Sequence, residues 1–287
     1  MSFMLDTKLG RAIFFLLRND LVWNLMSSED REFVQKNNLV FNTKRDDYAD
    51  PIKYDFGNNF DSTEGRENNK ICNILLEYLN DVNPEVVIEF GPGSGYYTRS
   101  IVEFPSVKKY IGIDVNEAFL SFVSGKLKTF NKSDFTYEVL VGDGSLMQLP
   151  NADSMIFLNT VHHIPNRKDL FANVVKSFRN QGSIFVCDPS HYIPRIVQLF
   201  KRFFSRGYLS DRHAQNLATH HFCSTGEYLE VCNTIDGLDI DHQWYWGLNR
   251  VYRRIWGDQI LGNDCGSMAE VITDRLAVQF SFIDPTS

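Results

Sequence analysis

A short β-branched run that ends in a glycine-rich turn constrains the fold of this chain more than any other feature. Residues 86–90 read Val-Val-Ile-Glu-Phe, which is typical of a buried strand, and residues 91–95 read Gly-Pro-Gly-Ser-Gly. Glycine permits sharp backbone turns and lets a ligand approach the main chain closely. A helix is predicted directly after the turn, over about 95–103. This order predicts a strand, turn and helix that open a ligand-binding parallel sheet.

The alternation of strands and helices continues beyond this turn. Further strands are predicted at 110–114, 136–141, 155–159, 183–188, 238–245 and 276–282. Helices are predicted at about 69–80, 116–129 and 167–179. Such alternation favours parallel βαβ units with helices on both faces of one sheet. We therefore predict an α/β fold, a Rossmann-like doubly wound sheet of about seven strands.

The rest of the chain divides into regions around this core. We predict a helical N-terminal cap and a polar flap over 1–68, the ligand-binding core over 69–188 and a lid insert over 189–223. Residues 224–287 would complete the core around a second insert. The stretch from Ser224 to Glu227 has the pattern of a capping box that starts a helix.

The predicted lid carries a basic amphipathic segment at 192–208. Its apolar side would cover the active site. The same pattern also suits a helix that lies on a membrane surface or one that receives a lipid-like substrate. A second basic stretch at 249–254 would bind an acidic group of a substrate or pair with acidic surface residues. Both alternatives stay open for each segment.

Composition narrows the function and the setting. The chain has 287 residues, 43% of them hydrophobic, and a net charge of −7, which counts against a nucleic-acid substrate. Five cysteines without a Cys-x-x-Cys pair favour a reducing compartment. The apolar run at 13–17 is too short to span a membrane. We expect a cytoplasmic protein without stable membrane insertion, whose oligomeric state is open, a homodimer included.

The spacing of the glycine turn discriminates between ligands. A dinucleotide site requires a small residue at the sixth position, and Tyr96 stands there. A Walker loop requires Gly-Lys followed by Ser or Thr, which is absent here. The sequence therefore favours a nicotinamide dehydrogenase less than the other enzyme classes discussed below.

Residues 86–98 resemble the first motif of class I S-adenosylmethionine-dependent methyltransferases of the small-molecule type, and the likeness extends over about 70–190. The resemblance implies that Gly91, Gly93 and Gly95 lie beside the methionine part of the cofactor. It implies that Glu89 helps to hold the cofactor amino group, often through water.

The resemblance also assigns residues at the ends of the next strands. Asp114, followed by Val115, would accept hydrogen bonds from the ribose hydroxyls. Asp143 would read the adenine amino group and Gly144 would contact the ring. Asn159 would complete the cofactor site at the end of the fourth strand.

Candidate catalytic residues follow the fourth and fifth strands. His163, His191 and Tyr192 are positioned to act on an acceptor proton, although His163 is often structural in similar enzymes. His213, His220, His221 and Cys223 include metal-binding residue types, but their spacing matches no familiar site, and we expect a polar lid and no metal.

The acceptor is predicted from a missing motif. Methyltransferases that act on amino groups of DNA, and some that act on protein glutamine, carry Asn/Asp-Pro-Pro-aromatic after the fourth strand, whereas this chain reads Asn-Thr-Val-His at 159–162. We therefore expect O-, N- or C-methylation of a small molecule, with secondary metabolism as one compatible setting. The alternatives are a cofactor-binding protein with a non-methylating activity and a nucleic-acid or protein methyltransferase.

Overall fold

The computed structural model describes residues 63–164, 167–189, 225–246 and 275–286. These ranges contain the predicted core and the two C-terminal strands. The predicted N-terminal cap, the lid with its amphipathic segment and the second insert lie outside the described residues. The same holds for His191, Tyr192 and the three histidines and Cys223 considered as metal ligands. These assignments therefore stay predictions.

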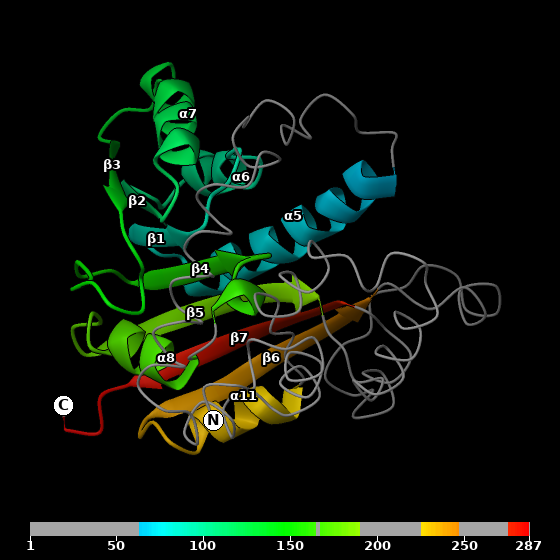
Figure 1. Cartoon of the computed structure of the whole chain (residues 1–287), viewed down its shortest axis with the longest axis vertical. Coiled ribbons are helices and arrows are strands. Elements are labelled where there is room, and N and C mark those ends of the chain that lie inside the picture. Colours follow the sequence, from blue (N-terminus) through cyan, green and yellow to red (C-terminus); the bar gives the residue numbers. More distant parts are fainter. Residues whose placement is uncertain (1–62, 165–166, 190–224, 247–274, 287) are drawn as a thin grey trace, which may run out of the picture.

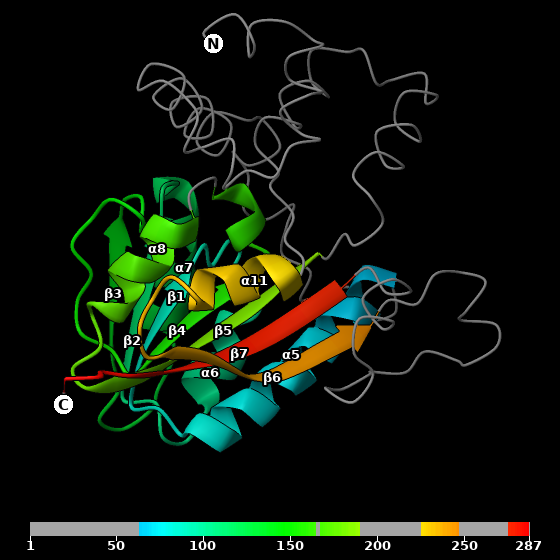
Figure 2. The ribbon, with the colours of Figure 1, turned by 90° about the horizontal axis from the view of Figure 1, so that it is seen from below.

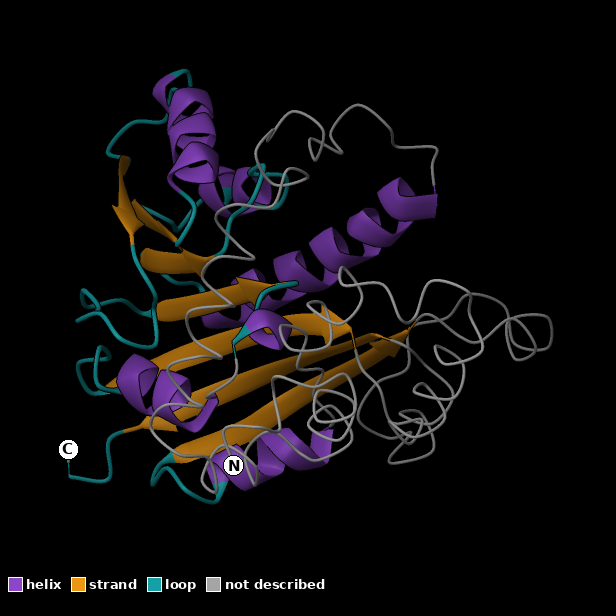
Figure 3. Ribbon diagram, viewed as in Figure 1, coloured by secondary structure: helices purple, strands orange, loops and turns teal. Residues whose placement is uncertain are grey.

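One seven-stranded sheet forms the centre of the described structure (Figures 1 and 3). Its strands are β1 (Val86–Phe90), β2 (Lys109–Asp114), β3 (Thr136–Val141), β4 (Ser154–Leu158), β5 (Gln181–Pro189), β6 (Leu238–Trp246) and β7 (Arg275–Ile283). The spatial order is β3-β2-β1-β4-β5-β7-β6, and the first five strands pair in parallel. β7 pairs antiparallel with β5, so its first residue lies beside the carboxyl end of β5. The predicted doubly wound sheet is confirmed.

Helices cover both faces of this sheet because successive strand residues point to opposite sides. The helices are α5 (Thr63–Val82), α6 (Thr98–Glu103), α7 (Glu117–Lys128), α8 (Arg167–Val175) and α11 (Thr225–Cys232). Apolar residues of α5, α6 and α7 share one buried cluster, and those of α8 and α11 share another. Figure 2 shows α5 and α6 on one side of β7 and α11 on the other.

The predicted strands agree with the structure to within two residues, but several helix boundaries differ. α5 begins at Thr63, within the segment predicted as a polar flap. Residues 63–68 carry no apolar periodicity, so the helical spacing of apolar residues begins only at Ile71. α8 ends at Val175 and not near 179. There the Ser177 hydroxyl donates to the Val174 carbonyl. The Ser177 and Phe178 backbone N–H groups donate to the Val174 and Val175 carbonyls, three residues earlier, which ends the helix in a tighter turn.

The described helices include none that is both long and apolar enough to cross a membrane.

Candidate functional site

The glycine turn between β1 and α6 takes a backbone path that favours glycine. Gly91, Gly93 and Gly95 have φ of 64°, 54° and 75°, in the left-handed region where a Cβ is strained. The Gly91 N–H donates to the Ile113 carbonyl at 2.7 Å, which joins the turn to β2. The Gly95 N–H donates to the Pro92 carbonyl at 2.9 Å. The turn is thus closed on itself and tied to the neighbouring strand.

The three glycines differ in what surrounds them. A Cβ on Gly91 would lie 2.7 Å from the Thr160 Oγ1, and one on Gly95 would lie 3.1 Å from Val123 Cγ2. A Cβ on Gly93 would meet no atom within 4 Å. The outer glycines are therefore needed for packing, whereas the middle one borders open space. Such space over an exposed backbone suits a ligand that approaches the main chain.

Asp114 ends β2 next to this turn. Its Oδ1 accepts a hydrogen bond from the Asn116 N–H at 2.9 Å. The backbone N–H groups of Gly93 and Val115 also interact with the carboxylate and lower its pKa. Burial has the larger, opposite effect and raises the pKa to about 6. The carboxylate thus links the middle glycine to the start of α7.

Glu89 lies beneath the turn on the α6 side of the sheet and is only 1% exposed. Its Oε2 accepts hydrogen bonds from Thr98 Oγ1 at 2.6 Å and from Tyr110 OH at 2.7 Å. Burial raises the pKa of Glu89 to about 7, against the lowering effect of these two donors. Gly112, its partner on β2, leaves room for the Tyr110 ring, because a Cβ there would lie 3.1 Å from the Tyr110 hydroxyl. Glu89 therefore braces α6 and β2 together under the turn.

Asp143 and Gly144 follow β3. The Asp143 Oδ1 accepts from the Ser145 N–H at 2.9 Å and from the Ser145 hydroxyl at 2.7 Å, which makes a tight local turn. A Cβ on Gly144 would clash with the Phe90 ring. The Gly144 carbonyl accepts from Asn173 Nδ2 at 2.9 Å. This loop is therefore packed against the end of β1, and the predicted adenine-binding residues lie in it.

Asn159 follows β4 and has a left-handed φ of 54°. Its side chain connects three parts of the fold, because Arg275 Nη1 donates to Oδ1 at 3.0 Å and Nδ2 donates to Tyr97 OH at 3.5 Å. Its backbone N–H donates to the Cys187 carbonyl at 2.8 Å. The next residue, Thr160, shares its hydroxyl proton between the Phe90 and Leu158 carbonyls, at 3.0 Å each. The exit of β4 is thus held against both β1 and β5.

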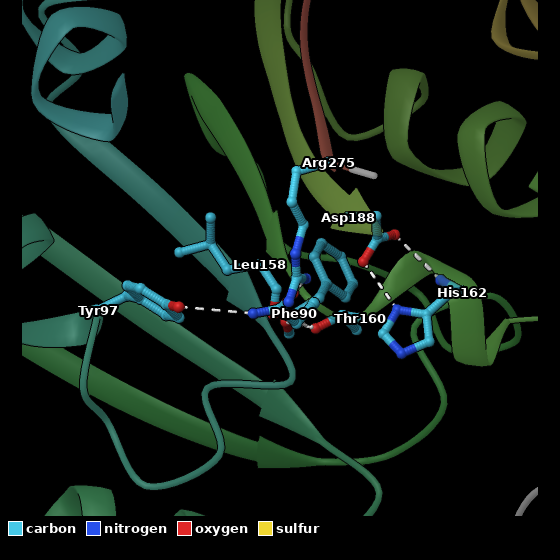
Figure 4. A network of polar contacts seen from close by, with 8 residues as sticks. Phe90, Tyr97, Leu158, Thr160, His162, Asp188 and Arg275 are labelled. Carbon is cyan, nitrogen blue, oxygen red and sulfur yellow. Dashed lines mark hydrogen bonds and ion pairs between the residues drawn. The ribbon is translucent and has the colours of Figure 1, made fainter. Parts of the chain in front are cut away.

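Asp188 near the end of β5 anchors the short helical turn η4 (Val161–His163) (Figure 4). Its Oδ2 accepts from the His162 N–H at 3.0 Å, and its Oδ1 lies 2.8 Å from His162 Nδ1. Burial raises the pKa of Asp188 to about 7, although Arg167 and Arg275 lower it. The His162 and His163 ring centroids lie 4.0 Å apart. The candidate base His163 therefore lies directly beside a buried Asp–His pair.

The structure brings together all the described residues that sequence reasoning assigned to the site, at the carboxyl ends of β1 to β4. Sequence reasoning missed Tyr97, Asp188, His162 and Arg275, which meet around Asn159 and Thr160. A carboxylate near the end of a core parallel strand was the available signal for Asp188. Arg275 had no signal, because its place depends on the antiparallel pairing of β7. No cluster of potential metal ligands occurs within the described ranges.

One part of the chain matches a known protein family. Residues 88–184 match a family described as a methyltransferase domain. This segment runs from within β1 into β5 and so contains the glycine turn and the ends of β2, β3 and β4. A comparison with curated protein sequences finds no match.

Solved structures share the fold at low sequence identity. Magnesium protoporphyrin IX methyltransferase from Synechocystis, solved with bound SAH, superposes with a TM-score of 0.55 at 10% identity, covering 85% of this chain and 96% of that one. The YcgJ protein of Bacillus subtilis gives 0.51 at 14% identity, with 74% and 97% covered. The plantazolicin methyltransferase BpumL, in complex with SAH, gives 0.50 at 12% identity, with 88% and 97% covered. These likenesses establish the fold of the described sheet and helices.

Proposed function

We propose that this chain, which carries a methyltransferase domain on the fold of the class I S-adenosylmethionine-dependent enzymes, transfers a methyl group from that cofactor to a small-molecule acceptor. The observation that carries the proposal is the glycine turn. Its middle glycine has open space above a left-handed backbone, and the Asp114 carboxylate lies at its side.

The residues present fit the cofactor. The backbone of Gly91, Gly93 and Gly95 would border its methionine part, and Asp114 with Val115 would hold the ribose. A second group, Asp143 with Gly144, would border the adenine, and Asn159 would lie near the reacting end. The buried carboxyl of Glu89 would act on the amino group through water. Carboxylates at these positions also suit the positive charges of the cofactor.

The bound cofactor supplies a methyl group that its positively charged sulfur makes electrophilic. The chain has to align an acceptor atom with the sulfur–methyl bond and to exclude water. It also has to take a proton where the acceptor loses one, and His163 is the described candidate base. Its position beside the Asp188–His162 pair supports this role, because that pair holds the turn that carries it.

The small-molecule class rests on two sequence observations. The net charge of −7 disfavours binding to phosphate backbones, and the Asn-Thr-Val-His sequence at 159–162 replaces the motif of DNA and glutamine methyltransferases. Detection of SAH formation with small molecules, compared with RNA, DNA and protein acceptors, tests this class. Methyl transfer to a macromolecule alone would contradict it.

Calorimetric titration with S-adenosylmethionine, S-adenosylhomocysteine and NAD tests the cofactor. We expect micromolar binding of the first two and none of NAD. Gly93→Ala should weaken binding at least about tenfold, because the left-handed backbone is strained by about 1–2 kcal/mol and the new methyl group enters the open space. Gly125→Ala is the matched control, since Gly125 is exposed within α7 and its Cβ meets nothing within 4 Å. Binding of NAD alone would refute the proposal.

A further inference from the structure

Arg275 is a cation that the topology delivers to the ligand end of the sheet. It is the first residue of β7, and its partner in the ladder is Pro189 at the carboxyl end of β5. Its side chain reaches across β5 to Asn159 behind β4, where Nη1 donates to Oδ1 at 3.0 Å. Figure 4 shows it between Tyr97 and the Asp188–His162 pair. The guanidinium thus lies at the end of β4, beside a residue that the proposed function places near the reacting centre.

A second guanidinium acts on the same carboxylate as Arg275. Two guanidinium groups, those of Arg167 and Arg275, interact electrostatically with one carboxylate, that of Asp188. Arg167 and Asp188 are both buried, at 6% and 3% exposure. Because burial raises the pKa of Asp188 to about 7, this carboxylate is only partly ionised near neutral pH. Two guanidinium charges therefore act on a carboxylate that is only partly charged.

The neutral groups beside Arg275 are arranged as donors. Because Arg275 donates to the amide oxygen of Asn159, the amide nitrogen faces Tyr97 OH. The Arg275 charge is also felt at the Tyr97 hydroxyl, whose pKa it lowers against the larger effect of burial. A guanidinium, an amide N–H and a phenol O–H are all groups that donate to an anion.

We propose that Arg275, with Asn159 and Tyr97, forms a subsite for a carboxylate. A planar guanidinium recognises a planar carboxylate through paired hydrogen bonds, and the charge makes these bonds stronger than neutral ones. Two sources offer this group next to the reacting centre, namely the methionine part of the cofactor and an acidic acceptor. The cofactor source rests on the function proposed above, whereas the acceptor source extends it.

A double-mutant cycle with the ligand tests the cofactor source. S-adenosylhomocysteine and its decarboxylated analogue, in which hydrogen replaces the carboxylate, are titrated into wild type, Arg275→Gln and Arg275→Lys by calorimetry. If the cofactor supplies the carboxylate, Arg275→Gln weakens S-adenosylhomocysteine binding at least about tenfold, leaves the analogue unchanged and is partly rescued by lysine. Arg179→Gln is the matched control, because Arg179 is exposed before the opposite end of β5.

A second arm tests the acceptor source. Wild type and Arg275→Gln, each with and without saturating S-adenosylhomocysteine, are titrated with benzoate and with benzamide and followed by ligand-observed NMR. Binding of benzoate to wild type, lost at least about fivefold in Arg275→Gln and absent for benzamide, supports an acidic acceptor. Thermal melts establish that each variant is folded, and Arg275→Lys replaces a variant that is not.

The two arms together decide the proposal. If Arg275→Gln changes neither the preference for S-adenosylhomocysteine over its analogue nor the binding of benzoate, the carboxylate subsite is refuted. Failure of wild type to bind S-adenosylhomocysteine refutes the proposed function instead, and the benzoate titration without it still tests the subsite.

Discussion

The ligand end of the sheet has two halves that are built differently. Left-handed glycines and carboxylates lie at the carboxyl ends of β1, β2 and β3. Asp114 and Asp143 each accept a hydrogen bond from a residue two positions further on, and Asp114 also interacts with the Gly93 N–H of the turn. At the carboxyl ends of β4 and β5 and at the start of β7, the contacts join distant segments. Asp188 accepts a hydrogen bond from His162, 26 positions away in the sequence. Asn159 donates to Tyr97, 62 positions away, and accepts from Arg275, 116 positions away.

The two halves therefore depend on different features of the fold. Short turns shape the first half and present its carboxylates and the open space at Gly93 largely through local geometry. The second half exists only when β4, β5 and β7 are in register. We therefore expect substitutions in the first half to act mainly on cofactor affinity, and substitutions in the second to act mainly on stability and on the acceptor.

The largest effect should come from Asp188→Ala. It removes a buried acceptor from the His162 ring and backbone and a carboxylate that interacts electrostatically with the buried guanidinium of Arg167. Loss of one partner of such a buried pair costs about 3–5 kcal/mol. Urea unfolding measures the change, and Asp236→Ala, at an exposed residue, is the control. A stability loss no larger than that of the control would break the distinction between the halves.

Gly91→Ala should produce the next largest effect. The left-handed backbone costs about 1–2 kcal/mol with a Cβ, and the contact with the Thr160 side chain adds overpacking of about 1–3 kcal/mol. We expect the turn to relieve this strain by leaving its glycine conformation, so that S-adenosylhomocysteine affinity, measured by calorimetry, falls at least about thirtyfold. Gly125→Ala should leave the affinity unchanged. An unchanged affinity in folded Gly91→Ala would show that the turn does not border the cofactor.

Asp114→Ala should weaken S-adenosylhomocysteine binding about tenfold, the equivalent of about 1.5 kcal/mol for charge-assisted hydrogen bonds. Asp114→Asn separates two causes, because it preserves an acceptor for the Asn116 N–H but removes the charge. Equal losses in both variants would indicate that the charge carries the effect. Unchanged affinity in folded Asp114→Ala would contradict the placement of the ribose.

A pH dependence of stability is shared by both halves. Burial raises the pKa of Glu89 to about 7, of Asp114 to about 6 and of Asp188 to about 7. The ordinary values lie near 4, so between about pH 4 and 7 the folded chain binds more protons than the unfolded chain. The stability contributed by these groups is therefore complete below about pH 4 and is lost as pH rises to about 7.

Urea unfolding of the ligand-free protein at several pH values between 5 and 7.5 measures this trend. Asp114→Asn should make it shallower because it removes one of the three groups. A stability contribution that instead rises with pH in wild type and is insensitive to Asp114→Asn would contradict the assignment. Binding of a cationic cofactor should release protons near pH 6.5, because its charge favours the ionised carboxylates.

The core and the first half of the site could be predicted because their signals are contiguous. The run from Val86 to Gly95 contains a strand, a turn and the strain that only glycine relieves, and these are properties of neighbouring residues. Boundaries were harder where polar residues hide a helix, as at the start of α5, or where i to i+3 hydrogen bonds end one early, as in α8.

The sequence by itself determined the alternation of strands and helices, the left-handed glycine turn and the carboxylates at or near the carboxyl ends of β1, β2 and β3. Each depends on the conformational preference or periodicity of residues close in the chain. Only the tertiary structure decided that Asp188 binds the His162 turn and that Arg275 reaches Asn159. The first contact requires the parallel pairing of β4 with β5, and the second requires the antiparallel entry of β7 beside β5. Strand pairing over such separations is set by packing of the whole sheet, which no local pattern encodes.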